Sequence, residues 1–120
     1  MLSTNGKIKD YDVSYVFAAQ KMIDENPKLD CTITDIAQKV GINEFKLKHG
    51  FKTLFKMGVH QYRIGVRLQQ AKHKLEETDL TIEQIAYTVG FKSRDGFANA
   101  FKREFKISPR YWRNQMPGVA

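Results

Sequence analysis

The sequence has 120 residues, of which 42% are hydrophobic, and it carries a net charge of +7. This length allows one compact domain or two small units that share a core. No apolar run approaches the roughly 18 residues that a membrane helix needs, and no secretory signal is visible. One cysteine, Cys31, rules out an internal disulfide and agrees with a reducing cytoplasm.

The excess positive charge is confined to residues 32–120, which carry a net charge of +8, whereas residues 1–31 carry −1. Basic charge concentrated in this way is the footprint expected for a polyanion, although a solvated lysine-rich surface would have the same composition. The polar residues 1–12 are expected to form a disordered tail or the remnant of a linker. Residues 117–120 are expected to form a second tail.

A helical period runs through the chain, whereas the alternation typical of strands is nearly absent. The spacing predicts a first helix over 14–26, which ends because Pro27 disfavours helical geometry in the residue before it. Thr32 and Thr81 each begin a further short helix, because each stands three residues before a side chain that completes a capping-box pattern.

Two segments of the sequence repeat each other. Residues 32–41 and 81–90 both read Thr-Ile-x-x-Ile-Ala-x-x-Val-Gly, and the Phe-Lys-x-x-Phe-Lys motif at 51–56 returns at 101–106. In each copy the alanine is small where a second helix must cross closely, and the glycine ends the short helix where a left-handed backbone is needed.

The second helix of each repeat is expected near 43–55 and near 93–105, with Asn43 and Ser93 as N-caps. Helix, tight glycine turn and helix form the motif whose second member lies in the major groove of DNA. The pattern therefore predicts two helix-turn-helix subdomains, one over 13–57 and one over 79–116.

The longest helix is predicted within a linker over 58–78. Its apolar residues Ile64, Leu68, Ala71 and Leu75 fall on one seam. A helix of this length spans about 30 Å, close to the roughly 34 Å of one DNA turn, so it can hold two reading helices over successive major grooves. Ser108 and Pro109 open a last short helix.

These motifs resemble the DNA-binding region of the AraC/XylS family of bacterial transcription regulators, over about residues 14–115. The resemblance rests on the paired Ile-Ala-x-x-Val-Gly units, on Arg67-Leu68-x-x-Ala71, and on Ile107-Ser108-Pro109-x-x-Trp112-Arg113. It implies an all-α fold of about seven helices, in which one monomer reads two adjacent major-groove segments and activates, or sometimes represses, transcription.

The chain departs from the family pattern at three positions. His49 stands where the family usually has arginine, Lys56 where it has glycine, and Trp112 where it has tyrosine. Glu44, in the first turn of the first reading helix, would lie near phosphates or base edges. These differences leave the target sequence open.

Base contacts in the first reading helix are expected from Phe45, Lys48 and His49, which lie on its groove face by position. Lys48 could donate to guanine and Phe45 could touch a thymine methyl group. Phe45 could instead pack in the core, and His49 could be a neutral surface histidine.

The second reading helix offers Arg94, Asp95, Ala98 and Asn99. Arg94 is the sharpest candidate, because a bidentate arginine–guanine pair is the commonest specific contact. Asn99 could pair with adenine or contact a phosphate, and Asp95 could accept from cytosine or stabilise the helix N-terminus.

Phosphate contacts are expected from a flanking set of polar residues: Lys46, Lys52, Arg63, Lys92, Ser93, Lys102, Arg103 and Arg113. Any one of these lysines could instead be a solvated charge. Arg63 and Arg113 could instead form salt bridges or cap backbone carbonyl groups.

An enzyme is not expected, and neither is a metal site or a cofactor. His49, His60 and His73 lack cysteine or carboxylate partners at a metal-ligand spacing. The sequence predicts a sequence-specific transcription regulator, with activation as its expected role and double-stranded DNA as its ligand. A non-specific nucleoid-type DNA-binding protein and a protein-docking module are the alternatives.

Three expectations concern the cell. The protein is expected in the bacterial cytoplasm, associated with the nucleoid and not with a membrane. RNA polymerase is a further candidate partner. A sensor or dimerisation domain is expected in the full-length protein, because the family often places one before this region.

Overall fold

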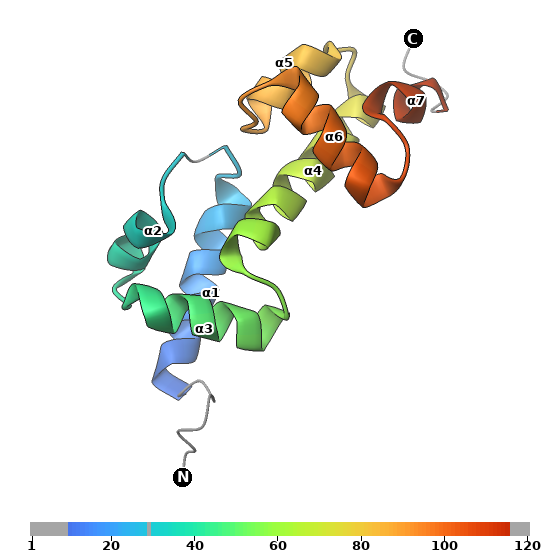
Figure 1. The fold of residues 1–120 in the computed structure, drawn as a ribbon. Helices are drawn as coiled ribbons and strands as arrows, with labels where there is room; N and C mark the ends of the chain where they lie inside the picture. Colours follow the sequence, from blue (N-terminus) through green and yellow to red (C-terminus); the bar gives the residue numbers. More distant parts are fainter. Residues whose placement is uncertain (1–9, 29, 116–120) are drawn as a thin grey trace. The chain divides into compact units, whose positions relative to one another are not determined.

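Seven α-helices and no strand make up residues 10–28 and 30–115, which are the residues that the structure, a computed structural model, describes (Figure 1). The all-α fold and the seven helices are those expected from the sequence. The helices are α1 Asp10–Glu25, α2 Ile33–Val40, α3 Glu44–Phe55, α4 Val59–Glu77, α5 Ile82–Thr88, α6 Arg94–Phe105 and α7 Pro109–Asn114.

Side chains cap the starts of α2, α3, α5, α6 and α7. The Thr32 hydroxyl accepts from the Asp35 backbone N–H at 3.1 Å, while the Asp35 carboxylate accepts from the Thr32 N–H at 3.1 Å. Thr81 and Gln84 repeat this reciprocal pair at 3.0 and 2.8 Å. Both predicted capping boxes are therefore confirmed. The other three starts are capped by single side chains, as expected, from Asn43, Ser93 and Ser108.

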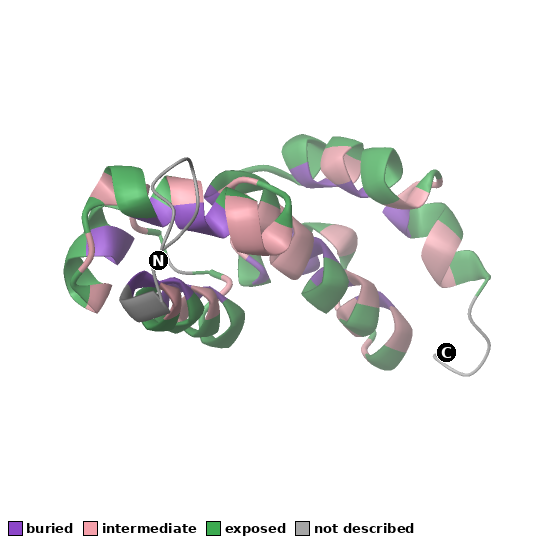
Figure 2. Cartoon of the chain, turned by 90° about the horizontal axis from the view of Figure 1, so that it is seen from below, coloured by how far each residue is buried: buried purple, intermediate pink, exposed green. Residues whose placement is uncertain are grey.

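The chain divides into two units, and the division between Ile64 and Gly65 falls inside α4. In the first unit α1, α2 and α3 all pack against one another. Their buried faces are visible as the inward surfaces in Figure 2. The core of this unit is formed by Val16, Ala19, Ile23, Ile36, Ala37, Leu47, Phe51 and Val59.

The second unit repeats this plan with α5 and α6 packed together and α7 packed on α6. The buried alanine Ala86 stands in α5 where Ala37 stands in α2, and its small side chain lets the following helix approach closely. The remaining core residues are Leu68, Ala71, Leu75, Ile85, Val89, Phe97 and Phe101.

An equivalent aromatic cluster closes each unit. In the first, Phe51, Phe55 and Tyr62 lie with ring centroids 4.6, 5.3 and 5.8 Å apart. The second repeats the arrangement at 4.5, 6.1 and 5.9 Å, in a cluster of Phe101, Phe105 and Trp112. The repeated Phe-Lys-x-x-Phe-Lys motif and the aromatic residue that follows it thus supply the same packing twice.

The polar edge of each cluster is held by a carboxylate from the supporting helix of its unit. Tyr62 donates its hydroxyl to Asp24 of α1 at 2.6 Å, and Trp112 donates its indole N–H to Glu76 of α4 at 3.0 Å. Burial, and then this carboxylate, raise the pKa of the Tyr62 hydroxyl. α1 in the first unit and α4 in the second are therefore equivalent.

Residues with positive φ follow four of the helices. Gly41 has φ +89° after α2 and Gly90 has φ +108° after α5, both as expected. Lys56 after α3 and Lys106 after α6 adopt φ +63° and +74°, although neither is glycine. The position where the family usually has glycine therefore keeps the left-handed conformation with a lysine.

The two predicted tails lie at the ends of the chain. The tail expected over 1–12 and the tail expected over 117–120 lie mostly outside the described residues. Residues 10–12 are helical, because α1 begins at Asp10, four residues before the predicted start. No helix among the described residues is both long enough and apolar enough to cross a membrane.

Replacing Gly41 with alanine should lower the free energy of unfolding by about 1 kcal/mol, because a left-handed backbone is strained once a Cβ is present. Gly65→Ala is the matched control. It lies inside α4 with no heavy atom within 4 Å of the added Cβ, so it should raise stability by up to about 1 kcal/mol. Urea denaturation followed by circular dichroism measures both. Equal stability of Gly41→Ala and the parent chain would contradict the role given to this turn.

Candidate nucleic-acid interface

The first turns of α3 present an aromatic side chain to solvent. Phe45 is 75% exposed, so its core-packing alternative is wrong. Its ring stacks on His49 one turn later, with centroids 6.3 Å apart and planes 9° apart. The two predicted base-contacting residues therefore stack as an exposed ring on a half-buried one, on a helix whose opposite face is anchored by buried Leu47 and Phe51.

Glu44 holds Lys48, the third predicted base-contacting residue of α3. The Lys48 ammonium lies 2.9 Å from the Glu44 carboxylate, in an i,i+4 pair that stays largely exposed. Glu44 also accepts a short hydrogen bond from the Thr34 hydroxyl of α2. That hydrogen bond, and then the contact with Lys48, lower the pKa of Glu44 below its ordinary value of 4.5. The carboxylate thus links the first turn of α3 to α2 through Thr34 and pairs with Lys48 one turn later.

The first turns of α6 present a different set of side chains. Arg94, Asp95 and Asn99 are exposed, whereas Ala98 is half-buried. The opposite face is anchored by Phe97 and Phe101, both fully buried. The four residues predicted to contact bases therefore share one end of α6.

Most of the residues predicted to contact phosphates are exposed. The exposed ones are Lys46, Lys52, Lys92, Ser93, Lys102 and Arg103. Ser93 also caps α6, since its hydroxyl oxygen accepts from the Gly96 N–H at 2.9 Å. A hydroxyl group can accept this bond and still donate its own proton to a phosphate.

Arg63 and Arg113 follow the same aromatic position in each repeat but have different partners. Arg63 is half-buried, and its guanidinium donates to the Cys31 sulfur at 3.9 Å. Arg113 donates to the carbonyl oxygens of three residues that end α4 and lead into α5, namely Leu75, Thr78 and Leu80. The carbonyl-capping alternative therefore describes Arg113, since its donors are directed at backbone.

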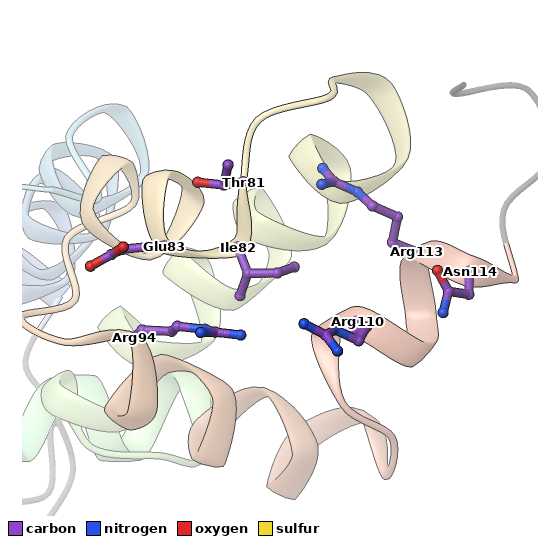
Figure 3. A pocket seen from close by; sticks show the side chains of 7 residues that line it. All are labelled: Thr81, Ile82, Glu83, Arg94, Arg110, Arg113 and Asn114. Carbon is purple, nitrogen blue, oxygen red and sulfur yellow. The ribbon is translucent and has the colours of Figure 1, made fainter.

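A cleft of about 450 Å³ opens beside the start of α6 (Figure 3). Arg94 and Arg110 extend into it from α6 and α7, with their guanidinium groups pointing toward one another. The complete lining is Thr81, Ile82, Glu83, Arg94, Arg110, Arg113 and Asn114. The predicted contacts omitted Arg110, and only its place directly after Ser108-Pro109, at the start of a helix, could have suggested it.

This arrangement of helices is that of a known protein family. A family model described as a helix-turn-helix domain matches residues 36–115. The raffinose operon transcriptional regulatory protein RafR of Pediococcus pentosaceus is 30% identical over 114 residues, which cover 95% of this chain and 40% of RafR. The transcriptional regulator ArgR of Pseudomonas aeruginosa is 32% identical over 97 residues, which cover 81% of this chain and 30% of ArgR. The chain thus spans two fifths or less of the length of these relatives.

Solved structures show the same fold. An AraC-type DNA-binding-domain regulator from Chromobacterium violaceum is 28% identical with a TM-score of 0.82, and the match covers 92% of this chain and all of that one. The DNA-binding domain of AdpA, solved in complex with a target DNA, is 21% identical with a TM-score of 0.80, covering 83% of this chain and 90% of that one. At this lower identity the likeness concerns the fold alone.

Removing the Thr34 hydroxyl by Thr34→Val should raise the pKa of Glu44 toward 4.5, because that hydrogen bond is the main stabiliser of the carboxylate. The sign for stability follows from linkage. With a lowered folded-state pKa, the contribution of Glu44 is present above its unfolded-state pKa and is lost as the pH falls through the folded-state value. Carboxyl chemical shifts followed by NMR across a pH titration measure the pKa directly. Lys48→Met should give a smaller rise, and the reverse order would contradict the assignment.

Arg113→Lys should lower the free energy of unfolding by about 1–3 kcal/mol, because lysine keeps the charge but cannot serve three carbonyl groups with a rigid fork. Arg110→Lys is the matched control, since Arg110 is exposed, and it should leave stability unchanged. Urea denaturation measures both variants. Unchanged stability in Arg113→Lys, together with weaker DNA binding, would return this residue to the phosphate contacts.

Proposed function

We propose that this chain, which belongs to the AraC-type helix-turn-helix family, is a DNA-binding transcription regulator that reads sequence with α3 and α6. The observation that carries the proposal is that the two units share their supporting contacts but differ in their exposed side chains. The supporting contacts are nearly identical in the two units, whereas the exposed side chains at the start of α3 and α6 differ. Two helices held by the same core contacts, but with different exposed side chains, are suited to bind two different DNA sequences.

In the first unit, the ring surface of Phe45 and His49 is proposed to enter the major groove. A largely exposed phenylalanine is costly in water and finds a suitable partner in the methyl group of thymine. Lys48 is proposed to donate to guanine. Its exposed ion pair with Glu44 costs little to break, because such surface pairs contribute about 0–1 kcal/mol.

In the second unit, Asp95, Ala98 and Asn99 are proposed to face base edges. Asn99 can pair with adenine in a bidentate manner, and Ala98 can contact a thymine methyl group. Asp95 can accept from cytosine, or it can act as a first-turn acid that stabilises the helix N-terminus. Two readers with such different chemistry predict a DNA site with two unlike halves.

Phosphate contacts are proposed from the exposed cations on or beside α3 and α6. Such contacts position the protein on the duplex but carry no direct sequence information. Lys102 and Arg103 follow the reading residues of α6, and Lys46 and Lys52 lie on α3. The DNA-binding domain of AdpA, which has the same fold, was solved with a target DNA, and this supports DNA as the ligand. Arg63 is retained as a candidate, although its guanidinium lies against Cys31.

The role in the cell is proposed by extension from the relatives. RafR is named as a regulator of the raffinose operon, and it is longer than this chain. We propose that this chain acts in transcription control in the cytoplasm, at the nucleoid, and that it activates through contact with RNA polymerase. The additional length of the relatives supports a sensor or dimerisation domain in the whole protein.

A non-specific DNA-coating protein is the nearest rival, because it would need the same cations. Selection of bound sequences from a random duplex pool at physiological salt separates the two. A specific regulator should enrich one motif with two unlike halves, and a coating protein should enrich none. Failure to bind any duplex would remove both and favour the protein-docking alternative.

On the selected site, Phe45→Ala should cost about 1–3 kcal/mol of binding free energy and relax preference at one base pair, because it removes an exposed groove contact. Lys102→Ala should weaken all sequences alike and flatten the salt dependence. Fluorescence anisotropy titrations on the selected site and on single base-pair variants measure both effects. Tyr87→Ala, which removes an exposed aromatic ring from α5, is the control and should leave the preferences unchanged. An unaltered preference in Phe45→Ala would remove this residue from the reading surface.

A further inference from the structure

The cleft beside the start of α6 holds an unusual arrangement of like charges. The guanidinium groups of Arg94 and Arg110 approach it from two helices and point toward one another (Figure 3). Neither group makes an ion pair or a hydrogen bond with any residue that the structure describes. Two like charges that face each other repel, so the geometry favours an anion between them.

The remaining charges of the cleft do not supply that anion. Glu83 is the one carboxylate in the lining, and its side chain points away from the gap between the two arginines (Figure 3). Arg113 contributes a third positive charge, but its donors are directed at the carbonyl groups of the loop that leads into α5. Arg113 therefore fixes the wall of the cleft, whereas Arg94 and Arg110 keep donors for a ligand.

We propose that this cleft seats one backbone phosphate of the DNA, clamped between Arg94 and Arg110. This inference rests on the proposed function. A guanidinium presents planar N–H donors that match the two non-bridging oxygens of a phosphodiester, and two such groups neutralise it from both sides. Arg94 thereby becomes a positioning residue that contacts phosphate, in place of the base-contacting role expected from its position on α6.

The source of the phosphate follows from where the cleft lies. It borders the start of α6, whose first two turns carry Asp95 and Asn99, which are proposed to enter the major groove, and phosphates line both edges of that groove. The cleft is open, and Arg94 and Arg110 are exposed, so a free phosphate would be held only weakly in water. A phosphate that arrives within a duplex is held at many other points at the same time.

Neutral substitutions in the DNA test the clamp directly. A single methylphosphonate, which removes the charge of one phosphate, is moved along the backbone of the selected site, and the affinity is measured for each position. For the parent chain, affinity should fall about tenfold at the clamped phosphate. Arg94→Ala and Arg110→Ala should each lose about tenfold on unmodified DNA, yet lose little more when that same phosphate is neutral.

The salt dependence gives a second readout. Each arginine variant should lower the slope of log K against log salt by about 0.9, and the double variant by little more, because only one phosphate is involved. Glu83→Gln should strengthen binding by a small factor, since it removes the negative charge at the edge of the cleft. Lys21→Ala on α1 removes an equal charge from an exposed position outside the cleft and should leave the methylphosphonate pattern unchanged. Circular dichroism confirms that each variant is folded.

Three results would overturn the clamp. The first is a loss in Arg94→Ala that depends on one base pair, which would restore the base contact. The second is the absence of any methylphosphonate position shared by the two arginine variants. The third is tight binding of inorganic phosphate by the protein alone, abolished in both variants, without a methylphosphonate effect. A parent chain that shows no preference among duplexes would instead contradict the proposed function itself.

Discussion

The reading surface of each unit depends on its aromatic cluster. α3 and α6 have 12 residues each, a length at which an isolated helix is marginal in water. Phe51 and Phe101 are fully buried at equivalent positions and bring the C-terminal halves of these helices against the next aromatic residue. The carboxylates of Asp24 and Glu76 then hold the polar edges of Tyr62 and Trp112. In the first turns only one face is buried, by Leu47 in α3 and Phe97 in α6, so the opposite face stays exposed.

Because the buried contacts and the exposed side chains use different faces of the helix, the same fold can present different side chains in its two units. In each unit the buried alanine and the aromatic cluster use the inward faces of the helices, and the capping box lies at the start of the preceding short helix. The exposed positions at the helix start take no part in these contacts, so they can differ without loss of stability. At these positions Phe45 corresponds to Asp95 in the other copy, and His49 corresponds to Asn99. A repeated fold with diverged exposed residues is therefore what a site with two unlike halves requires.

The features that the sequence predicted are those set by short-range chemistry. Capping boxes and N-caps involve residues three apart, so their pattern is readable without tertiary structure. The exposure of Phe45 was not readable, because an aromatic residue suits both a core and a groove. The left-handed backbone at Lys56 and Lys106 was not predicted, because neither residue is the glycine that usually indicates it.

The partners of the arginines depend on longer-range geometry. Arg113 bonds to carbonyl groups more than 30 residues away, whereas Arg63, at the matching point of the repeat, lies against Cys31. Position on a helix gave the face on which Arg94 lies, but it gave neither the cleft nor Arg110 across it. Candidate residues were therefore found by sequence, and their division between base, phosphate and structural contacts needed coordinates.

The two reading helices also differ in how their cations are held. On α3, Lys48 is already paired with Glu44, whose carboxylate also accepts a hydrogen bond from Thr34. A duplex must exchange that pair for its own contact, so the net gain in Coulomb energy is small and depends on whether a matching acceptor is present. On α6, Arg94 faces another guanidinium, so any phosphate relieves repulsion whatever the neighbouring bases are. The cations of the two helices thus differ in what surrounds them, although both helices are built on the same support.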